Sequence, residues 1–301
     1  MIGQATVDWQ AHLEVWFLIF GVVSIGLYVA RVLGPKAVAA GYKPISRAQK
    51  IWFVAAAASM WVVSDWPIHD VAEEHLYFVH MIQHLFLSML IPAMFLLSMP
   101  RWLFELLLQP DGRVRKWLGV ASRPIVAGVV FNALTLLLHW TSIVQLSFES
   151  GAAHFVFHLL VFSSGLLMWM PVVGPVDEWR LQPLPQCIYL FAMSIVPTVP
   201  GGWLVFAQSV VYRHYDTPER LWGIDPLVDQ QAAGLVMKLM GGFFLWGVIV
   251  VIFGRWAKKE QQENVRNRRE RHRRPQNVGS ALTFEQVQVE FASSTPPLEH
   301  E

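Results

Sequence analysis

The chain has 301 residues, of which 54% are hydrophobic and only 15% are charged. An ordinary soluble domain carries about 25% charged residues, so this composition indicates an integral membrane protein. The single cysteine, Cys187, excludes an intrachain disulfide, a Cys-x-x-Cys site and a cysteine-rich metal site. The apolar part has no surface that would bind nucleic acid, and we expect membrane lipid to surround it instead.

Seven apolar runs follow one another along the chain, and a helix needs about 20 such residues to cross the hydrocarbon of a bilayer. They cover residues 13–33, 51–66, 75–99, 124–146, 152–170, 186–207 and 232–254. We therefore predict an all-α, polytopic membrane protein with seven transmembrane helices. Pro92 is expected to kink the third helix toward its far end.

Lysine and arginine crowd the loops after the first and third runs and the tail after the seventh, whereas the other loops are acidic or nearly neutral. The positive-inside rule then places the N-terminus outside and the C-terminus in the cytoplasm. We expect a transmembrane domain over residues 1–256 and a cytoplasmic tail over 257–301. The tail opens with a basic block at 258–274, which is predicted to lie against anionic lipid, and disorder is expected beyond it.

Two histidine pairs with a spacing of four residues open the third and fifth runs. They are His80 with His84, and His154 with His158. On a helix this spacing places both rings of a pair on one face. Ionisable residues within a membrane are costly and usually functional, and neutral imidazole is a good ligand for Cu, Zn, Fe and Ni. We predict that the two pairs face one another and bind a metal, with copper as the first choice.

Depth follows from the helical rise of about 1.5 Å per residue. His84 and His158 lie about 10 Å below the outer ends of their runs, level with His139 in the fourth run. His80 and His154 then lie one turn further out, toward an acidic loop that would attract a cation and that contains Asp70, Glu73 and Glu74. His139 is a candidate ligand as well, although a lone membrane histidine often serves as a hydrogen-bond partner between helices.

Three segments resemble the CtaG-type cytochrome c oxidase assembly factors, in the order in which that family has them. They are His80-Met-Ile-Gln-His84 running on to Pro92, His154-Phe-Val-Phe-His158 running on to Gly165, and Asp229-Gln-Gln before the last run. The similarity extends over about residues 13–256 and leaves out the tail. One departure is His139-Trp-Thr, where the family pattern has a proline soon after the histidine.

The resemblance implies a non-enzymatic protein of the bacterial cytoplasmic (inner) membrane that matures haem–copper oxidases, as a copper chaperone for the CuB or CuA centre. Its expected partners are oxidase subunits and another copper carrier. The implied metal ligands are His80, His84, His154 and His158. Asp229 is expected to act either at the metal, as a ligand or by orienting an imidazole, or as the N-cap of the seventh helix. His75 is a further candidate for the same surroundings.

Two other functions stay open. A transmembrane b-type cytochrome also uses histidines on facing helices, as axial ligands to haem. Some seven-helix membrane hydrolases hold zinc through His-x-x-x-His with a carboxylate and a serine, which Asp65 and Ser64 could supply. Haem and zinc rank below copper. Thioethers favour Cu(I), and Met60, Met81 and Met237 fall in the outer halves of their runs.

Overall fold

The computed structural model describes residues 3–4, 6–109, 111–273 and 283–293 of the chain. Within these ranges five helical segments are long and apolar enough to cross a membrane: Leu13–Ala39, Tyr77–Ser98, Gly151–Val173, Pro183–Val205 and Pro226–Glu270. Two bent helix pairs, Arg47–Ser64 with Ile68–His75 and Arg113–Ala121 with Pro124–Leu138, raise the number to seven if each pair is one span. The prediction of an all-α polytopic membrane protein is confirmed. The predicted number of seven spans is reached only if each bent pair is counted as one span.

The first part of the chain carries the spans up to the third. Its elements are β1 (Gly3–Gln4), α1 (Leu13–Tyr28), η1 (Val29–Leu33), α2 (Gly34–Ala39), α3 (Arg47–Ser64), α4 (Ile68–Asp70), η2 (Val71–His75), α5 (Tyr77–Leu85), η3 (Phe86–Leu90) and α6 (Ile91–Ser98). The acidic stretch that the sequence placed in a loop is therefore helical, as α4 and η2. Pro92 lies in the first turn of α6, directly after the π-helical turn η3, where its missing N–H interrupts the regular ladder.

The second part of the chain carries the remaining spans. Its elements are α7 (Arg101–Leu107), α8 (Arg113–Ala121), α9 (Pro124–Leu138), α10 (Thr141–Glu149), α11 (Gly151–Val173), η4 (Asp177–Trp179), α12 (Pro183–Ile195), α13 (Thr198–Val205), η5 (Arg213–Tyr215), β2 (Glu219–Arg220), η6 (Leu221–Gly223), α14 (Pro226–Leu235), η7 (Val236–Met240), α15 (Gly241–Arg273) and α16 (Phe284–Ser293). The two short strands β1 and β2 pair in parallel.

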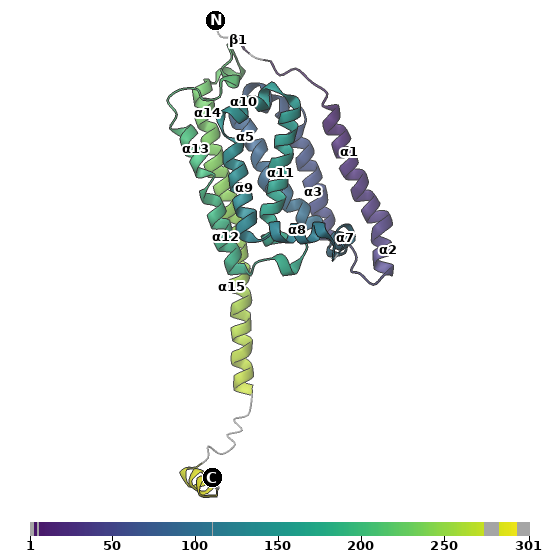
Figure 1. Ribbon diagram of the computed structural model, residues 1–301, viewed down its shortest axis with the longest axis vertical. Helices are drawn as coiled ribbons and strands as arrows, with labels where there is room; N and C mark the ends of the chain where they lie inside the picture. Colours follow the sequence, from purple (N-terminus) through teal and green to yellow (C-terminus); the bar gives the residue numbers. More distant parts are fainter. Residues whose placement is uncertain (1–2, 5, 110, 274–282, 294–301) are drawn as a thin grey trace, which may run out of the picture. The chain divides into compact units, whose positions relative to one another are not determined.

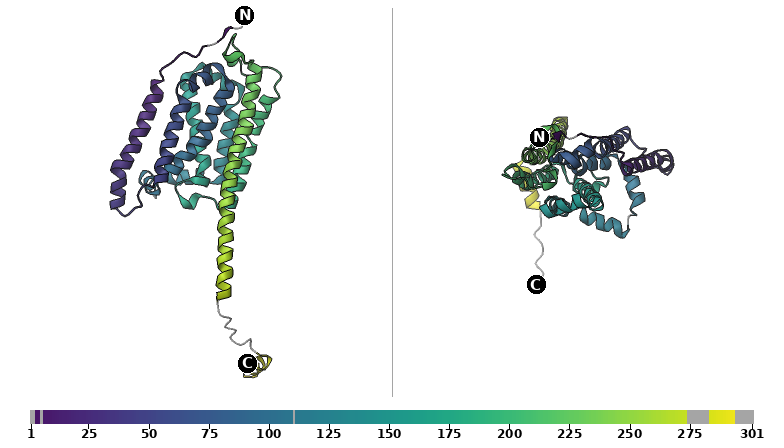
Figure 2. Two further views of the ribbon diagram at one scale, coloured as in Figure 1. Left: turned by 180° about the vertical axis from the view of Figure 1, so that it is seen from behind. Right: turned by 90° about the horizontal axis from the view of Figure 1, so that it is seen from above.

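The two histidine-bearing segments lie side by side within the first 253 residues (Figure 1). The helix α11 packs along η3 and α6 on one side and against α9 on another, while α14 packs against α5 and α13. At the edge of this bundle α1 contacts α3 (Figure 2). Val15 is the only residue of α1 that is buried. Large apolar side chains on the rim, such as Phe17 and Ile125, are exposed as lipid contact requires.

A close approach at Gly165 sets how α11 sits against the third span. A Cβ added at Gly165 would lie 2.1 Å from the carbonyl oxygen of Ser88 and 2.9 Å from Cγ of Pro92. Only a hydrogen atom fits there, which is the way small residues let membrane helices pack closely. Because Gly165 lies about two turns from His158, this contact fixes the distance between the two histidine helices.

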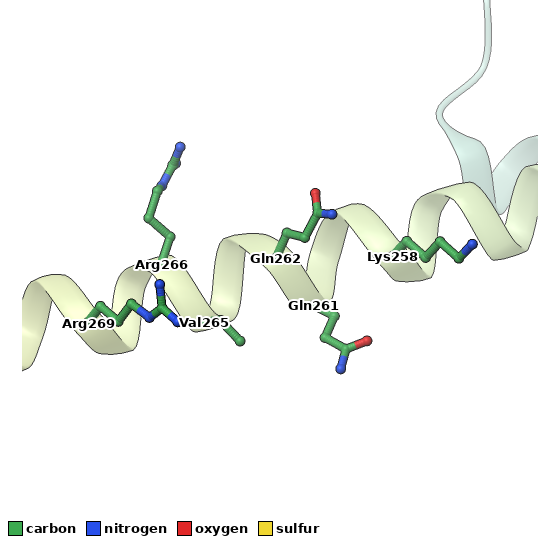
Figure 3. A pocket seen from close by; sticks show the side chains of 6 residues that line it. All are labelled: Lys258, Gln261, Gln262, Val265, Arg266 and Arg269. Carbon is green, nitrogen blue, oxygen red and sulfur yellow. The ribbon is translucent and has the colours of Figure 1, made fainter.

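Internal contacts divide the chain into two units, Met1–Phe253 and Gly254–Glu301. In the second unit six side chains of α15 outline a shallow hollow, and they are Lys258, Gln261, Gln262, Val265, Arg266 and Arg269 (Figure 3). All six come from this one helix, so the hollow is a basic helix surface rather than an enclosed site. The predicted boundary after residue 256, the cytoplasmic placement of the tail and its contact with lipid stay predictions.

Within the stretch of the tail for which disorder is predicted, the structure describes one short helix, α16. The backbone N–H of Thr283 donates to Oε1 of Gln286 at 3.0 Å, which caps the start of this helix. Phe284, Val287 and Phe291 then recur at helical spacing, a local pattern that composition alone does not reveal. The rest of the predicted disordered stretch, residues 275–282 and 294–301, lies outside the described residues.

Substituting Gly165→Ala tests the close contact between α11 and the third span. The added methyl group must push α11 away from Ser88, so we expect a loss of about 1–3 kcal/mol in stability. Thermal unfolding of the purified protein in detergent measures this loss. Gly247→Ala in α15 is the matched control, because a Cβ there meets nothing within 4 Å. Equal unfolding temperatures for the two variants would contradict the contact.

Candidate metal centre

Three imidazoles from two helices converge on one point. His80 and His84 come from α5 and His158 comes from α11, and one nitrogen of each lies within 4.8 Å of the others. The ring centroids are 4.4 Å apart for His80 and His84, and 5.1 Å apart for His84 and His158. Nitrogens bound to one ion by bonds of about 2.0–2.1 Å lie at most about 4.2 Å apart, so at most a small ring movement completes a site. We call these three residues the inner group.

A second set of ligand-type atoms shares His158 with the first. Glu73 from η2 joins His154 and His158 of α11, again with one atom of each within 4.8 Å. The Glu73 carboxylate pairs with Nε2 of His154, whose Nδ1 lies 2.9 Å from the Ser147 hydroxyl. We call Glu73, His154 and His158 the outer group, because His154 lies one turn nearer to the start of α11, the end predicted to face outside.

Several buried imidazole nitrogens have no partner among the described residues. They are Nδ1 of His80, Nε2 of His139 and Nε2 of His158. A buried polar atom without a partner costs about 1–3 kcal/mol, and folded proteins leave few of them. Two of these atoms belong to the inner group and the third to the neighbouring His139, and neutral imidazole nitrogens are suited to a transition-metal ion.

His139 lies beside the inner group without belonging to it. Its ring centroid is 6.2 Å from that of His84. Its Nδ1 donates to the carbonyl oxygen of Thr135 at 2.6 Å, so Nε2 carries the lone pair. A ring held in this way by a backbone carbonyl is typical of metal-binding histidines. Because Thr135 belongs to the same helix, this hydrogen bond does not join two helices, which was the alternative role expected for His139.

A line of charged groups leads from the start of α1 to the outer group. Nε2 of His12 lies 2.5 Å from Oδ1 of Asp70, and the His12 ring is 4.8 Å from the ring of His69. His69 in turn has Nδ1 3.8 Å from Oε1 of Glu73. Burial lowers the pKa of His12, but the carboxylates of Asp70 and Glu14 outweigh this and raise the pKa above its usual 6.5. The stabilisation from the His12–Asp70 ion pair is therefore fully present below about pH 6.5, and it is lost as the pH rises through the raised pKa of His12.

A cavity of about 780 Å³ joins these groups. Its polar end is lined by His12, His69, Asp70, Glu73, His154 and His158, and apolar residues such as Leu87 and Phe162 line the remainder. The outer group therefore faces open space within the protein.

The chain matches the sequence profile of the Caa3_CtaG family, the cytochrome c oxidase caa3 assembly factors, over residues 26–259. The chain belongs to this family. It is also 28% identical over 215 residues to uncharacterized proteins of Mycobacterium bovis and Mycobacterium tuberculosis. This similarity covers 64% of the chain and 32% of each relative, so the chain spans about a third of the length of the curated relatives it matches. No solved structure matches the chain significantly.

Within this Caa3_CtaG protein, Asp229 has a role that the sequence did not indicate. Its Oδ2 accepts the backbone N–H of Tyr77 at 2.7 Å, and its Oδ1 accepts that of Phe78 at 3.0 Å. Asp229 therefore caps α5, the helix of His80, and the expectation that it caps the seventh helix is wrong. That cap is Asp225, whose side chain accepts the N–H of Leu227. The buried carboxylate is stabilised by two charge-assisted hydrogen bonds at a helix N-terminus.

Two further residues complete the comparison with the sequence. His75 ends η2 with Nε2 4.0 Å from the Glu74 carboxylate, and it belongs to neither group. Glu73 was expected only as part of an acidic loop that attracts cations. The turn η2 and the break at Leu76 bring its carboxylate onto His154, and no spacing in the sequence indicates that contact.

The Asp229→Ala variant tests the cap. It leaves the amides of Tyr77 and Phe78 without their acceptor, so we expect about 1–3 kcal/mol lower stability. Metal binding should weaken too, because the start of the His80 helix is no longer held. Asp225→Ala is the control, which removes the cap of α14 at a cost of about 0.5–2 kcal/mol. Thermal unfolding and metal titration together decide: only Asp229→Ala should change both, and unaltered metal binding in that variant would refute the positioning role.

Proposed function

We propose that this protein helps to assemble cytochrome c oxidase by holding a copper ion in the inner group and passing it to the oxidase. The observation that supports this most directly is the convergence of three imidazoles, of which His80 and His158 have a buried nitrogen without a partner among the described residues, in a member of an oxidase assembly family. Its partners are oxidase subunits and a second protein that supplies copper. It changes no substrate and is not an enzyme.

The donor atoms near the inner group favour copper over zinc. A small cavity of about 50 Å³ is lined by His84 and His139 together with Met81, Met89 and Met237. Thioethers beside imidazoles suit Cu(I), whereas zinc sites in proteins use imidazole, thiolate and carboxylate. His139, with its free Nε2, is the next imidazole that an ion in the inner group would meet.

The orientation belongs to the same proposal. Each bent pair counts as one span, the N-terminus lies outside, and the C-terminus lies in the cytoplasm of a bacterial cell. Both histidine pairs then lie near the outer face of the cytoplasmic membrane. An ion arriving from outside reaches the polar end of the large cavity without crossing the bilayer.

The geometry gives less support to the two other functions. A haem needs a flat gap between two axial rings, whereas His80, His84 and His158 approach one another on a single point. For a zinc hydrolase the candidate carboxylate is Asp65. Its Oδ2 accepts the indole N–H groups of Trp16 at 3.0 Å and Trp61 at 2.7 Å, so it is engaged away from the inner group.

Copper binding can be measured directly on the purified protein. We expect about one copper per chain, because the two groups share His158 and cannot both be filled. Replacing His84 and His158 together with alanine should abolish binding, since each group then loses a ligand. His75→Ala is the control, because this ring lies outside both groups. Elemental analysis with an absorption spectrum gives the result, and copper retained by the double variant would refute the site.

The cellular role is tested in a strain that lacks the protein. We expect it to lose cytochrome c oxidase activity, because the oxidase would not receive its copper. The wild-type gene should restore the activity, and the gene carrying His84→Ala with His158→Ala should not. Oxidase activity and oxidase subunit levels in isolated membranes are the readouts. Normal activity in the deletion strain would refute the assembly role, and rescue by the double variant would refute the part played by the histidines.

A further inference from the structure

We propose that the outer group, Glu73, His154 and His158, is a second cation site, able to hold a copper or a zinc ion, through which copper reaches the inner group. This inference rests on the proposed function, since it supplies the route by which the inner group is loaded. The outer group combines one carboxylate with two imidazoles, a donor set that suits both ions.

Glu73 is held in place by backbone contacts as well as by its carboxylate. The carbonyl oxygen of Glu73 lies 2.8 Å from Nε2 of His214, and the preceding carbonyl, that of Ala72, accepts the Tyr215 hydroxyl at 2.8 Å. The His214 ring is itself stacked on Phe148 with centroids 3.8 Å apart. The carboxylate is therefore preorganised beside His154, on the wall of the large cavity.

The shared residue makes a transfer between the two groups possible. His158 lies between them, with its ring centroid 4.2 Å from that of His154 and 5.1 Å from that of His84. An ion that moves inward keeps His158 and exchanges Glu73 and His154 for His80 and His84. Because at least one ligand is retained throughout, the ion never loses all of its donors in an apolar surrounding, which would be very costly.

The outer group also continues the line of charged groups at the start of α1. Asp70, His12 and His69 line the same cavity as Glu73; Nε2 of His12 lies 2.5 Å from Asp70, and Nδ1 of His69 lies 3.8 Å from Glu73. Carboxylates that line the mouth of a cleft raise the local concentration of cations and speed their association. The protein thus offers carboxylates that attract a cation, then the mixed-ligand outer group, and then the all-imidazole inner group.

The test uses the full-length protein in lipid nanodiscs, titrated separately with Zn²⁺ and Cu²⁺. His84→Ala breaks the inner group, and we expect this variant still to bind one ion, now in the outer group. Adding Glu73→Gln to His84→Ala should abolish binding. X-ray absorption on the zinc-loaded His84→Ala protein should show oxygen and imidazole ligands. His80→Phe breaks the inner group in a second way, and size-exclusion elution with thermal unfolding identifies variants that have not folded.

Loading kinetics give an independent measurement. Glu73→Gln alone should keep one ion in the inner group but fill it about tenfold more slowly, because the entering ion loses a ligand in the outer group. Glu74→Gln is the matched control. It removes the same charge from the adjacent residue, which also lines the large cavity but lies in neither group, so its loading should be slowed much less than that of Glu73→Gln.

The outcomes separate this inference from the proposed function. A wild-type protein that binds no ion would refute the copper role itself. A wild-type protein that binds one ion, with folded His84→Ala and His80→Phe variants that bind none, would overturn the outer site alone. Equal loading rates for Glu73→Gln and Glu74→Gln would overturn it as well, because the carboxylate would then act only through its charge.

Discussion

The burial of imidazole nitrogens without partners is the constraint on which the rest of this structure depends. His80, His139 and His158 each have such an atom, and all three residues line one small cavity. The sum of these costs is several times the net contribution of an ordinary hydrogen bond. This cost calls for a bundle that holds the helices rigidly, and an ion in the proposed inner group would give His80 and His158 the partner that they lack.

Three different interactions provide that rigidity, one for each helix. The Asp229 carboxylate fixes the start of α5, a hydrogen bond to Thr135 fixes the ring of His139 on α9, and the absence of a side chain at Gly165 lets α11 close onto the third span. None of them is a metal ligand in the proposed site. Together they hold the rings near the productive geometry before an ion arrives, which is how binding sites limit the entropy cost of binding.

Local features of the sequence predicted much of this arrangement. Apolar runs predicted the helices. The four-residue spacing and the helical rise predicted that His84, His139 and His158 lie at one depth, with His154 one turn nearer to the outside. Contacts between distant residues were not predictable in that way. Asp229 caps a helix that begins 152 residues earlier. Glu73 reaches His154 only because η2 and the break at Leu76 replace the expected loop, and a single sequence carries no pairwise signal for either contact.

The difference in charge between the two groups bears on how an ion can move. A cation held by His80, His84 and His158 keeps its full charge in a surrounding of low dielectric constant, which limits the affinity. In the outer group the Glu73 carboxylate offsets one unit of that charge. An ion held there, however, leaves buried nitrogens of the inner group without a partner. These two contributions to the binding free energy oppose each other, so neither group binds the ion very tightly. A protein that has to accept an ion and then release it to a partner needs sites of this kind, whereas a storage protein would place carboxylates around both.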